Sequence, residues 1–345
     1  MRLDHFLTPP NCQTCGLPGD CHPMTTIAQH FTLGEPQVAG PLTVFGVFGP
    51  APQLEYRDFA GSVGHGAFVK ELEGGASVND LLVGNPTDLP LLVYEGEEVL
   101  GAQQNRTFDL SALIAPHSQV HLPVSCVEQG RWDGSRHSQP FTASPQAAYP
   151  SLRRRKRATA NRRAAAGLEA RADQGEVWQE VEDRMLAHGV DSASAAMSDV
   201  YDGRRDALDE ISAQLHVVNG SSGAIAFVGA TPVALDYISS PAVFAGLFHR
   251  LAQGYALDAV EAQPEPADPF EAERFLHAVL EAPRHPLPTP GLGRGVRLLV
   301  PEANGSGLEH EDELVQLCAF PPEDGPAQAG PRPIARPSRR RSSRS

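Results

Sequence analysis

Two neighbouring segments of the chain alternate apolar and polar residues with a period of two, and this pattern constrains the fold more than any other feature. The first segment is Arg106–Ala115 and the second is Gln119–Glu128. The residues that share the apolar face are Phe108, Leu110, Ala112 and Ile114, and then Val120, Leu122, Val124 and Cys126. Such alternation is typical of antiparallel strands with one buried face. The connection Pro116-His117-Ser118 therefore predicts a β-hairpin.

The short connection also predicts the register of this hairpin. The expected cross-strand pairs are Ile114 with Val120, Ala112 with Leu122, Leu110 with Val124, Phe108 with Cys126, and Arg106 with Glu128. Four apolar pairs are then followed by one opposite-charge pair at the open end. Cys126 would face the core, which favours a packing role over that of a nucleophile with His117 or His121 as its base.

The rest of the chain shows strand patterns, then helical patterns, then strand patterns again. We expect further strands at residues 42–48, 66–72, 81–83, 91–95, 224–228, 233–238, 296–300 and 314–320. Apolar residues at three- and four-residue spacing predict helices at 173–189 and 191–215, from Pro241 onward, and near 269–280. Gly189 suits the C-cap of the first of these helices, and Ser240 suits the N-cap of the helix that starts at Pro241. This order predicts an α+β fold, with short-stranded, mainly antiparallel sheets packed against a block of amphipathic helices.

Three regions are expected along the chain. Residues 1–30 lack periodicity and predict a disordered extension, and residues 323–345 predict a disordered Arg/Pro/Ser tail. Residues 31–322 predict a single large α+β domain, which is β-rich at 40–132, helical at 160–282 and ends in strands at 294–320. The extension contains Cys12, Cys15, Cys21 and His22, which are zinc-type ligands, but their tight spacing favours a disordered leader over a metal site.

The charge and the cysteine usage narrow the classes of partner and the compartment. A formal net charge of −14 argues against a general binder of nucleic acid or of anionic membranes. No stretch is long and apolar enough to span a membrane, and the first ten residues do not resemble a secretory signal. Five cysteines without a disulfide-type pattern are typical of a reducing cytoplasm. The basic run Arg153–Arg157 predicts a solvated helix start rather than a nucleic-acid contact.

Polar residues of several kinds gather at the expected open end of the hairpin. They lie in three short segments that contain Glu95, Glu97 and Glu98, then Gln103, Gln104, Asn105 and Arg106, and then Glu128, Gln129, Arg131 and Trp132. The period of a strand would place Glu95 and Glu97 on one face and Glu98 on the other. We therefore expect a functional site at this end of the sheet.

These residue types suggest roles in a site. Glu95, Glu97 and Glu128 could supply acid–base catalysis or ligate a divalent metal, which is the one cofactor that the residues suggest. The other eight residues could hold a substrate, with Arg106 and Arg131 on a phosphate or carboxylate and Trp132 on a base. In the simpler alternative, Arg106 and Glu128 form a strand-end salt bridge that contributes about 0–1 kcal/mol.

Several motifs of the chain resemble those of one prokaryotic family. They are Leu42-Thr-Val-Phe45, Glu95-Gly-Glu-Glu98 with Gly101-Ala-Gln-Gln-Asn-Arg106, Ser125-Cys-Val-Glu-Gln-Gly-Arg-Trp132, Asp173-Gln174 with Val177-Trp178, and Gly305-Ser-Gly-Leu308. The family is named for its association with ADP-ribosylglycohydrolases and with rhodanese–phosphatase superfamily proteins. The resemblance covers roughly residues 31–322, and it implies work near ADP-ribose, NAD-derived or related nucleotide-sugar metabolism. The family usually has a lysine where this chain has Gln103.

Two main hypotheses for function follow from the residues and the resemblance. The first is a hydrolase or related enzyme that acts on a nucleotide, NAD-derived or ADP-ribose-type substrate through the carboxylate, amide and arginine cluster. The second is a non-catalytic ligand-binding or sensor module that partners an ADP-ribose-processing enzyme. A purely structural interaction protein would instead leave the cluster splayed, with no pocket.

Overall fold

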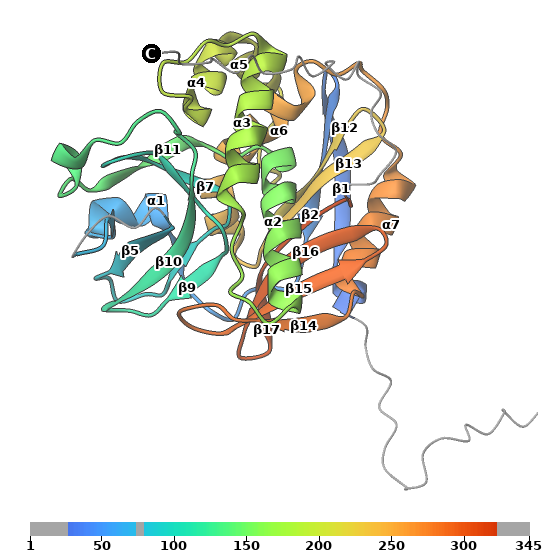
Figure 1. The fold of residues 1–345 in the computed structure, drawn as a ribbon. Helices are drawn as coiled ribbons and strands as arrows, with labels where there is room; N and C mark the ends of the chain where they lie inside the picture. Colours follow the sequence, from blue (N-terminus) through green and yellow to red (C-terminus); the bar gives the residue numbers. More distant parts are fainter. Residues whose placement is uncertain (1–26, 74–78, 323–345) are drawn as a thin grey trace, which may run out of the picture.

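The computed structural model describes residues 27–73 and 79–322 (Figure 1). The zinc-type motif at Cys12–His22 and the Arg/Pro/Ser tail lie outside these residues. Residues 27–30, which were expected to belong to a disordered extension, instead form a 3₁₀ turn, Ile27–His30. The fold is α+β with mainly antiparallel sheets, as the sequence predicted.

An eight-stranded antiparallel sheet forms one side of the molecule (Figure 1). Its strands in spatial order are β1 (Thr32–Ala39), β2 (Leu42–Phe48), β12 (Gly223–Val228), β13 (Thr231–Ile238), β17 (Glu313–Phe320), β16 (Ala303–His310), β15 (Arg294–Val300) and β14 (Arg284–Leu287). The five expected strands in this set are confirmed to within one or two residues. The sequence analysis missed β1, β14 and β16, and in β16 the run Gly305-Ser-Gly307 has no apolar alternation to detect.

Helices cover both faces of this sheet. The adjacent residues Val44 and Phe45 of β2 point to opposite faces and belong to two different hydrophobic clusters. The cluster around Val44 includes α6 (Pro241–Ala259), and the cluster around Phe45 includes α7 (Pro269–Leu280). The side chain of Ser240 accepts a hydrogen bond from the amide of Val243, so α6 begins with the expected cap.

The remaining strands form a second group of sheets around a separate hydrophobic cluster. The six-stranded sheet contains, in order, β11 (Phe141–Ala147), β7 (Glu97–Gly101), β8 (Arg106–Phe108), β10 (Ser118–Cys126), β5 (Asp80–Asn85) and β4 (Phe68–Lys70). The three-stranded sheet contains β3 (Arg57–Asp58), β6 (Leu91–Val93) and β9 (Ala112–Ile114). The short helix α1 (Phe59–Ser62) adds Phe59 to the same cluster.

The predicted register of the hairpin is wrong by two residues. In the structure, β8 and β10 pair Phe108 with Val124 and Arg106 with Cys126. A shift of two leaves every side chain on its expected face, so the apolar alternation is retained. Arg106, however, lies opposite Cys126 and not opposite Glu128.

The expected long first strand is also divided in two. It stops after β8, and β9 pairs instead with β6 in the smaller sheet. Between them Asp109 is buried, where it accepts a hydrogen bond from the Ser125 hydroxyl (2.7 Å) and pairs with Lys156 (3.0 Å). The ion pair with Lys156 directs the side chain of Asp109 to the helix that contains this lysine. The backbone leaves the six-stranded sheet at Asp109.

That helix is α2 (Pro150–Ala165), which lies between the two groups of sheets (Figure 1). The prediction that its basic run is a solvated helix start is wrong, because Arg153, Lys156 and Arg157 are all buried. Each of them pairs with a buried carboxylate: Arg153 with Asp236 of β13, Lys156 with Asp109, and Arg157 with Glu95. The basic face of α2 therefore joins the two groups of sheets through buried ion pairs.

The helix after α2 is capped at both ends, and the C-cap is the one that the sequence predicted. α3 (Gln174–His188) begins at Asp173, whose carboxylate accepts the amides of Gly175 and Glu176, and it ends at Gly189 with φ +63°. The single helix expected at 191–215 is instead α4 (Met197–Gly203) followed by α5 (Arg205–Ser212). Ala196 forms a β-bridge with Glu128, so the chain before α4 is extended.

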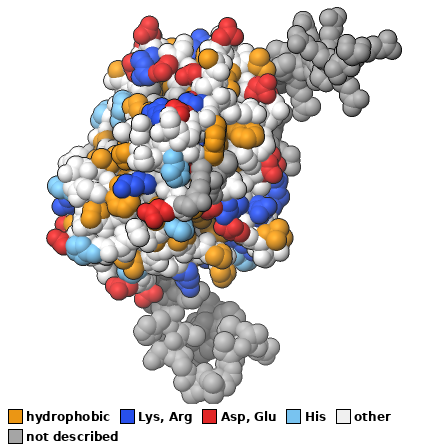
Figure 2. Space-filling view, turned by 60° about the vertical axis from the view of Figure 1, so that its left-hand side comes forward, with side chains coloured by type: hydrophobic (Ala, Val, Ile, Leu, Met, Phe, Trp, Pro, Cys, Tyr) orange, Lys and Arg blue, Asp and Glu red, His pale blue; other side chains and the backbone are white. Residues whose placement is uncertain are grey.

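None of the helices within the described ranges combines the length and the hydropathy that a membrane crossing requires. The face that is turned forward in Figure 2 carries Lys and Arg side chains interspersed with Asp and Glu. No broad basic surface is visible on this face.

Candidate functional site

The open end of β8 and β10 brings together most of the polar residues that the sequence analysis selected. The amide of Asn105 donates to Glu128 Oε2 (3.0 Å), and the Gln104 side chain donates to the carbonyl of Glu128 (3.1 Å). The amide of Val127 donates back to the carbonyl of Asn105 (3.1 Å). The segment before β8 and the segment after β10 are thus tied together.

Arg131 stabilises the turn that precedes β8. Its Nε donates to Glu128 Oε1 (2.7 Å), its Nη1 to the carbonyl of Ala102 (2.9 Å), and its Nη2 to Asn105 Oδ1 (3.0 Å). Ala102 has φ +41°, a left-handed conformation that is strained in a residue with a Cβ atom. Such strain persists only where the surroundings impose it, and it is frequent at functional sites.

Arg106 is fully buried at this end of the sheet, and most of its guanidinium lacks a partner. Nη1 donates to Gln104 Oε1 (2.8 Å), but neither Nε nor Nη2 has a hydrogen-bond acceptor. The guanidinium lies 5.9 Å from the centroid of the Trp132 ring, and Trp132 is half exposed. Burial lowers the pKa of Arg106, although the neighbouring groups of Cys126 and Glu71 raise it.

Glu71 is a neighbour of Arg106 that the sequence analysis missed. It follows β4, it is buried, and neither of its carboxylate oxygens has a hydrogen-bond partner among residues 27–73 and 79–322. Burial raises its pKa, while the charge of Arg106 and then the nearby amide of Gln103, which does not reach hydrogen-bond geometry, lower it. No local motif marks Glu71, because β10 and β5 lie between β8 and β4 in the sheet, and β4 instead approaches the other end of the sheet through its contacts with β11.

Gln103 completes the group of unpartnered atoms. Its Nε2 contacts His137 Nδ1 (3.2 Å), whereas its buried Oε1 has no partner. We call Arg106, Glu71 and Gln103 the Arg106 centre. It holds two donors, Arg106 Nε and Nη2, and three acceptors, Glu71 Oε1 and Oε2 and Gln103 Oε1, all buried and without hydrogen bonds to the residues that the structure describes.

An arrangement of this kind is costly in an empty protein. A buried polar atom without a hydrogen bond costs about 1–3 kcal/mol, and a charged one costs more. Native proteins therefore have few such atoms, and those that remain are explained by strain, chemistry or a bound group. The Arg106 centre has five such atoms. A ligand with both donors and acceptors, or ordered water, would satisfy them best.

The same strand end carries a pair of carboxyl groups in different states, Glu98 and Glu128. Glu98 lies opposite Thr107, and Val99 lies opposite Arg106, so Glu98 and Arg106 point to different faces. Burial raises the pKa of Glu98 to about 8, although hydrogen bonds from Ser144 and Gln146 lower it.

Glu128 has the opposite shift. Burial favours its neutral form, but the hydrogen bonds from Arg131 and from the amide of Asn105 hold its pKa below the usual value. Glu128 also acts electrostatically on both Glu98 and Arg106. The strand end therefore places a neutral carboxylic acid near an ionised carboxylate at neutral pH, a combination that is typical of acid–base catalysis.

We expect Glu98→Gln to remove a pH dependence of stability. Glu98 binds its proton more tightly in the folded protein than in the unfolded chain, so its contribution is fully present below pH 4.5 and is lost as the pH rises through about 8. For one group the slope approaches about 1.4 kcal/mol per pH unit in this window. Urea unfolding of both proteins at several pH values within the window measures it, and parallel profiles would contradict the raised pKa of Glu98.

The expected convergence is wrong for Glu95 and Glu97. Glu95 pairs with Arg157 of α2 and accepts a hydrogen bond from Ser306 of β16 (2.8 Å). Glu97 pairs with Arg250 of α6 (3.1 Å) and accepts the amide of Tyr94 (2.8 Å). Both carboxylates therefore join a sheet to a helix, and Glu95 also joins the two groups of sheets.

Three further predictions concern single residues at this end. Cys126 is buried, as expected for a packing residue, and it is a free thiol. Gln129 is exposed, and Arg106 forms no ion pair with Glu128, which pairs with Arg131 instead. Within the described residues, no three His, Cys, Asp or Glu side chains gather closely enough to hold a metal ion.

The comparisons with known proteins place the chain in a family. Residues 30–320 match the family model described as the ARG and Rhodanese-Phosphatase-superfamily-associated Protein domain. No curated protein and no solved structure matches the chain. The matched span covers well over half of the 345 residues and includes the Arg106 centre. The resemblance of the motifs is thereby confirmed, and the chain belongs to the ARG and Rhodanese-Phosphatase-superfamily-associated Protein domain family.

Proposed function

We propose that the Arg106 centre binds a small molecule of the nucleotide, NAD-derived or ADP-ribose type. The observation that carries this proposal is the group of five buried polar atoms without hydrogen bonds beside the half-exposed ring of Trp132. The family name, which records an association with ADP-ribosylglycohydrolases, supports the same class of ligand.

The donors and acceptors of the centre suggest which part of such a ligand would enter. Arg106 offers two N–H groups, whereas Glu71 and Gln103 offer oxygen atoms. A ligand group must then carry acceptors and donors side by side, as a nucleobase edge, a carboxamide or a ribose diol does. A lone phosphate would suit Arg106 but would be repelled by Glu71 in its ionised form. Trp132 is placed to stack on a base next to this centre.

We expect Trp132→Leu to weaken the binding of ADP-ribose and NAD by about 5- to 100-fold, because stacking on an aromatic ring contributes about 1–3 kcal/mol per base. Ribose 5-phosphate, which has no base, should lose much less affinity. The chain has two tryptophans, so Trp178→Phe leaves Trp132 as the only indole. Quenching of the Trp132 fluorescence then reports a ligand beside this ring, and titration calorimetry measures the dissociation constants of the Trp132→Leu variant and of the unmodified protein.

The control for this experiment is Phe270→Leu, which truncates another exposed aromatic side chain, on α7. A thermal-shift screen with NAD, ADP-ribose, nucleotides and divalent metals comes first, because a ligand stabilises the folded state by RT ln(1 + [L]/Kd). Absence of any shift at millimolar concentrations would contradict the proposal. A shift that Trp132→Leu leaves unchanged would place the ligand elsewhere on the protein.

A second candidate function is hydrolysis of the same class of ligand. It is favoured by the opposite pKa shifts of Glu98 and Glu128, which would suit a general acid and a general base. Glu98→Gln and Glu128→Gln should then abolish turnover of ADP-ribose or NAD while the thermal shift remains. A protein that binds the ligand without turnover would be a sensor module and not a hydrolase.

The family name also supports a protein partner among the ADP-ribosylglycohydrolases or the rhodanese–phosphatase proteins. We place the protein in the cytoplasm, because Cys126 and Cys318 are free thiols of the kind that a reducing compartment preserves. Co-purification of the tagged chain with an enzyme of either class tests the partnership.

A further inference from the structure

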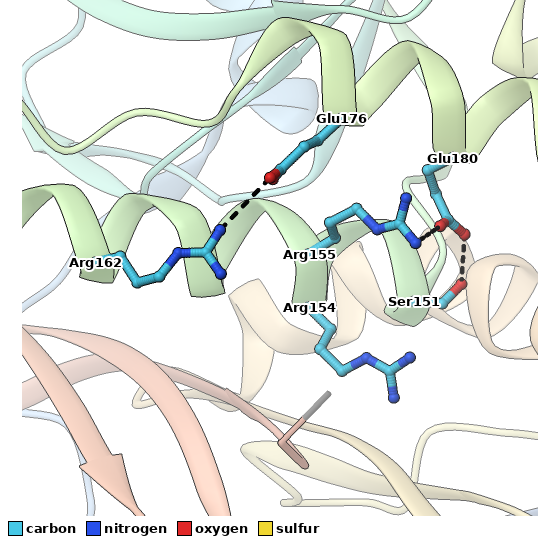
Figure 3. A pocket seen from close by; sticks show the side chains of 6 residues that line it. All are labelled: Ser151, Arg154, Arg155, Arg162, Glu176 and Glu180. Carbon is cyan, nitrogen blue, oxygen red and sulfur yellow. Dashed lines mark hydrogen bonds and ion pairs between the residues drawn. The ribbon is translucent and has the colours of Figure 1, made fainter. Parts of the chain in front are cut away.

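A polar cavity lies on the outer side of α2, away from the ion pairs that this helix buries. The cavity has a volume of about 380 Å³ and is lined by Ser151, Arg154, Arg155, Arg162, Glu176 and Glu180 (Figure 3). Four of these residues come from α2 and two from α3. All six side chains are polar, and three of them are guanidinium groups.

The helical repeat explains how so many charges meet here. Ser151, Arg155 and Arg162 recur at about whole turns of α2, and Glu176 and Glu180 stand one turn apart on α3. Arg155 contacts Glu180 (3.0 Å) and Arg162 contacts Glu176 (3.5 Å), and Figure 3 shows each guanidinium reaching across to its glutamate. The hydroxyl of Ser151 also donates to Glu180 (3.3 Å).

Arg154 differs from the other two arginines. Within the described part of the chain it has no hydrogen bond and no ion pair, and its Nε is buried without an acceptor. Figure 3 shows its side chain directed away from α3, with no interaction drawn to it. The two glutamates offset two of the three positive charges, so the cavity keeps one uncompensated guanidinium in a chain whose formal net charge is −14.

We propose that this cavity is a binding site for the phosphate group of a small molecule. Guanidinium groups bind phosphate oxygens through pairs of charge-assisted hydrogen bonds, and Arg154 has donors free for them. No aromatic ring lines the cavity, so the site does not provide for stacking of a base. The ligand class is therefore a phosphate, a diphosphate or a sugar phosphate.

In this proposal Glu176 and Glu180 compete with the phosphate for the guanidinium groups of Arg162 and Arg155. An entering phosphate would share Arg155 with Glu180 and Arg162 with Glu176. Burial raises the pKa of Glu180, although Arg155 and Arg184 lower it, so binding of an anion nearby is eased when Glu180 takes up a proton. In the alternative without a ligand, Glu176 and Glu180 only hold α2 and α3 together, and replacing them would lower the stability of the protein without changing anion binding.

This site is independent of the Arg106 centre. The cavity lies on the solvent side of α2, whereas Lys156, on the buried side, donates to the carbonyl of Phe108 in β8 (2.9 Å). The two proposals can therefore fail separately: loss of phosphate binding here says nothing about nucleotide binding at Arg106.

The experiment is a titration of the full chain with inorganic phosphate, pyrophosphate and ribose 5-phosphate at constant ionic strength, followed by calorimetry. The variants are Arg154→Gln and Glu180→Gln, and the control is Arg294→Gln, an exposed arginine of β15 that pairs with Glu309. We expect Arg154→Gln to weaken binding at least tenfold, Glu180→Gln to strengthen it, and Arg294→Gln to leave it unchanged. Pyrophosphate should bind more tightly than phosphate, because it spans more than one guanidinium.

Two outcomes would overturn the proposal. One is the absence of binding by all three anions at millimolar concentration in a protein whose unfolding curve is normal. The other is binding that Arg154→Gln and Arg294→Gln weaken equally, which would indicate a general attraction of anions to surface arginines. Circular dichroism of each variant tests whether the fold is retained, and we expect Arg154→Gln to retain it, since Arg154 has no partner within the described residues to lose.

Discussion

Replacing Arg153 with methionine is expected to lower the free energy of unfolding by about 3–5 kcal/mol, the range found when one partner of a buried ion pair is removed. Arg153 donates to both oxygens of Asp236, with Nη1 at 3.0 Å and Nη2 at 2.5 Å. Both side chains are almost completely buried. The variant would leave the charge of Asp236 in the core without its counter-ion.

The surroundings of Asp236 contain two hydroxyl donors, which offset part of this loss, and aromatic rings near Arg153, whose lost contacts add to it. Tyr94 and Tyr255 each donate a hydroxyl to it at 2.5 Å, so both remain bound to a carboxylate that has lost its cation. Arg153 also packs near the rings of Tyr94 and Phe320, at 5.4 and 5.0 Å from their centroids. The same side chain excludes any Cβ atom at Gly96, where one would lie 2.7 Å from the arginine Cδ.

Urea unfolding measures the effect, and two further variants define its cause. Arg205→Met removes an exposed arginine that pairs with Asp202, and it should change stability by about 0–1 kcal/mol. Arg153→Met combined with Asp236→Asn removes the buried charge and should recover part of the loss. If Arg153→Met alone costs less than about 1 kcal/mol, the ion pairs of α2 do not hold the two groups of sheets together.

The parts of the fold that were predictable are those that local sequence determines. Alternation over Arg106–Ala115 and Gln119–Glu128 indicated the strands and the face of Cys126, and Ser240, Asp173 and Gly189 indicated the helix ends. The register was not determined by the loop alone. It depends on Asp109, whose partners Lys156 and Ser125 come from other elements, and a hairpin considered by itself contains no sign of them.

The position of the candidate site in the sheet was predictable, but several of the residues that form it were not. Residues 103–106, Glu128 and Arg131 meet because they flank two paired strands. Glu71 was not predictable, because strand order separates β4 from β8, and the contact between the edge strands β4 and β11 depends on the curvature of the whole sheet. Glu95 and Glu97 were wrongly assigned to the site, because they pair with arginines that lie far along the chain, and a local pattern does not show such partners. A basic run such as that of α2 is usually solvated, and nothing within the run shows that carboxylates are buried opposite it.

Arg106 and Arg157 provide a direct test of which buried arginine serves the fold and which serves a ligand. Both are fully buried, but Arg157 pairs with Glu95 and donates to the carbonyl of Asp109 (2.9 Å). Arg157→Met should therefore cost about 3–5 kcal/mol. Arg106→Met removes a charge with two unpartnered donors, and the neighbouring Glu71 can become neutral because burial already raises its pKa. Its stability should fall by less than about 1 kcal/mol or should rise.

Ligand binding should respond in the opposite order. ADP-ribose at a hundredfold excess over its dissociation constant stabilises a protein by about 2.7 kcal/mol, and Arg106→Met should abolish this stabilisation. Unfolding in urea with and without the ligand gives both quantities from the same samples. If Arg106→Met is as unstable as Arg157→Met, Arg106 is needed for the stability of the fold, and the proposal that its free donors serve a ligand is wrong. A stable Arg106→Met protein that still binds ADP-ribose with full affinity would move the nucleotide site away from this centre. Low cost in the empty protein together with loss of binding is the combination that a ligand-binding arginine requires, since its hydrogen bonds are completed only by the ligand.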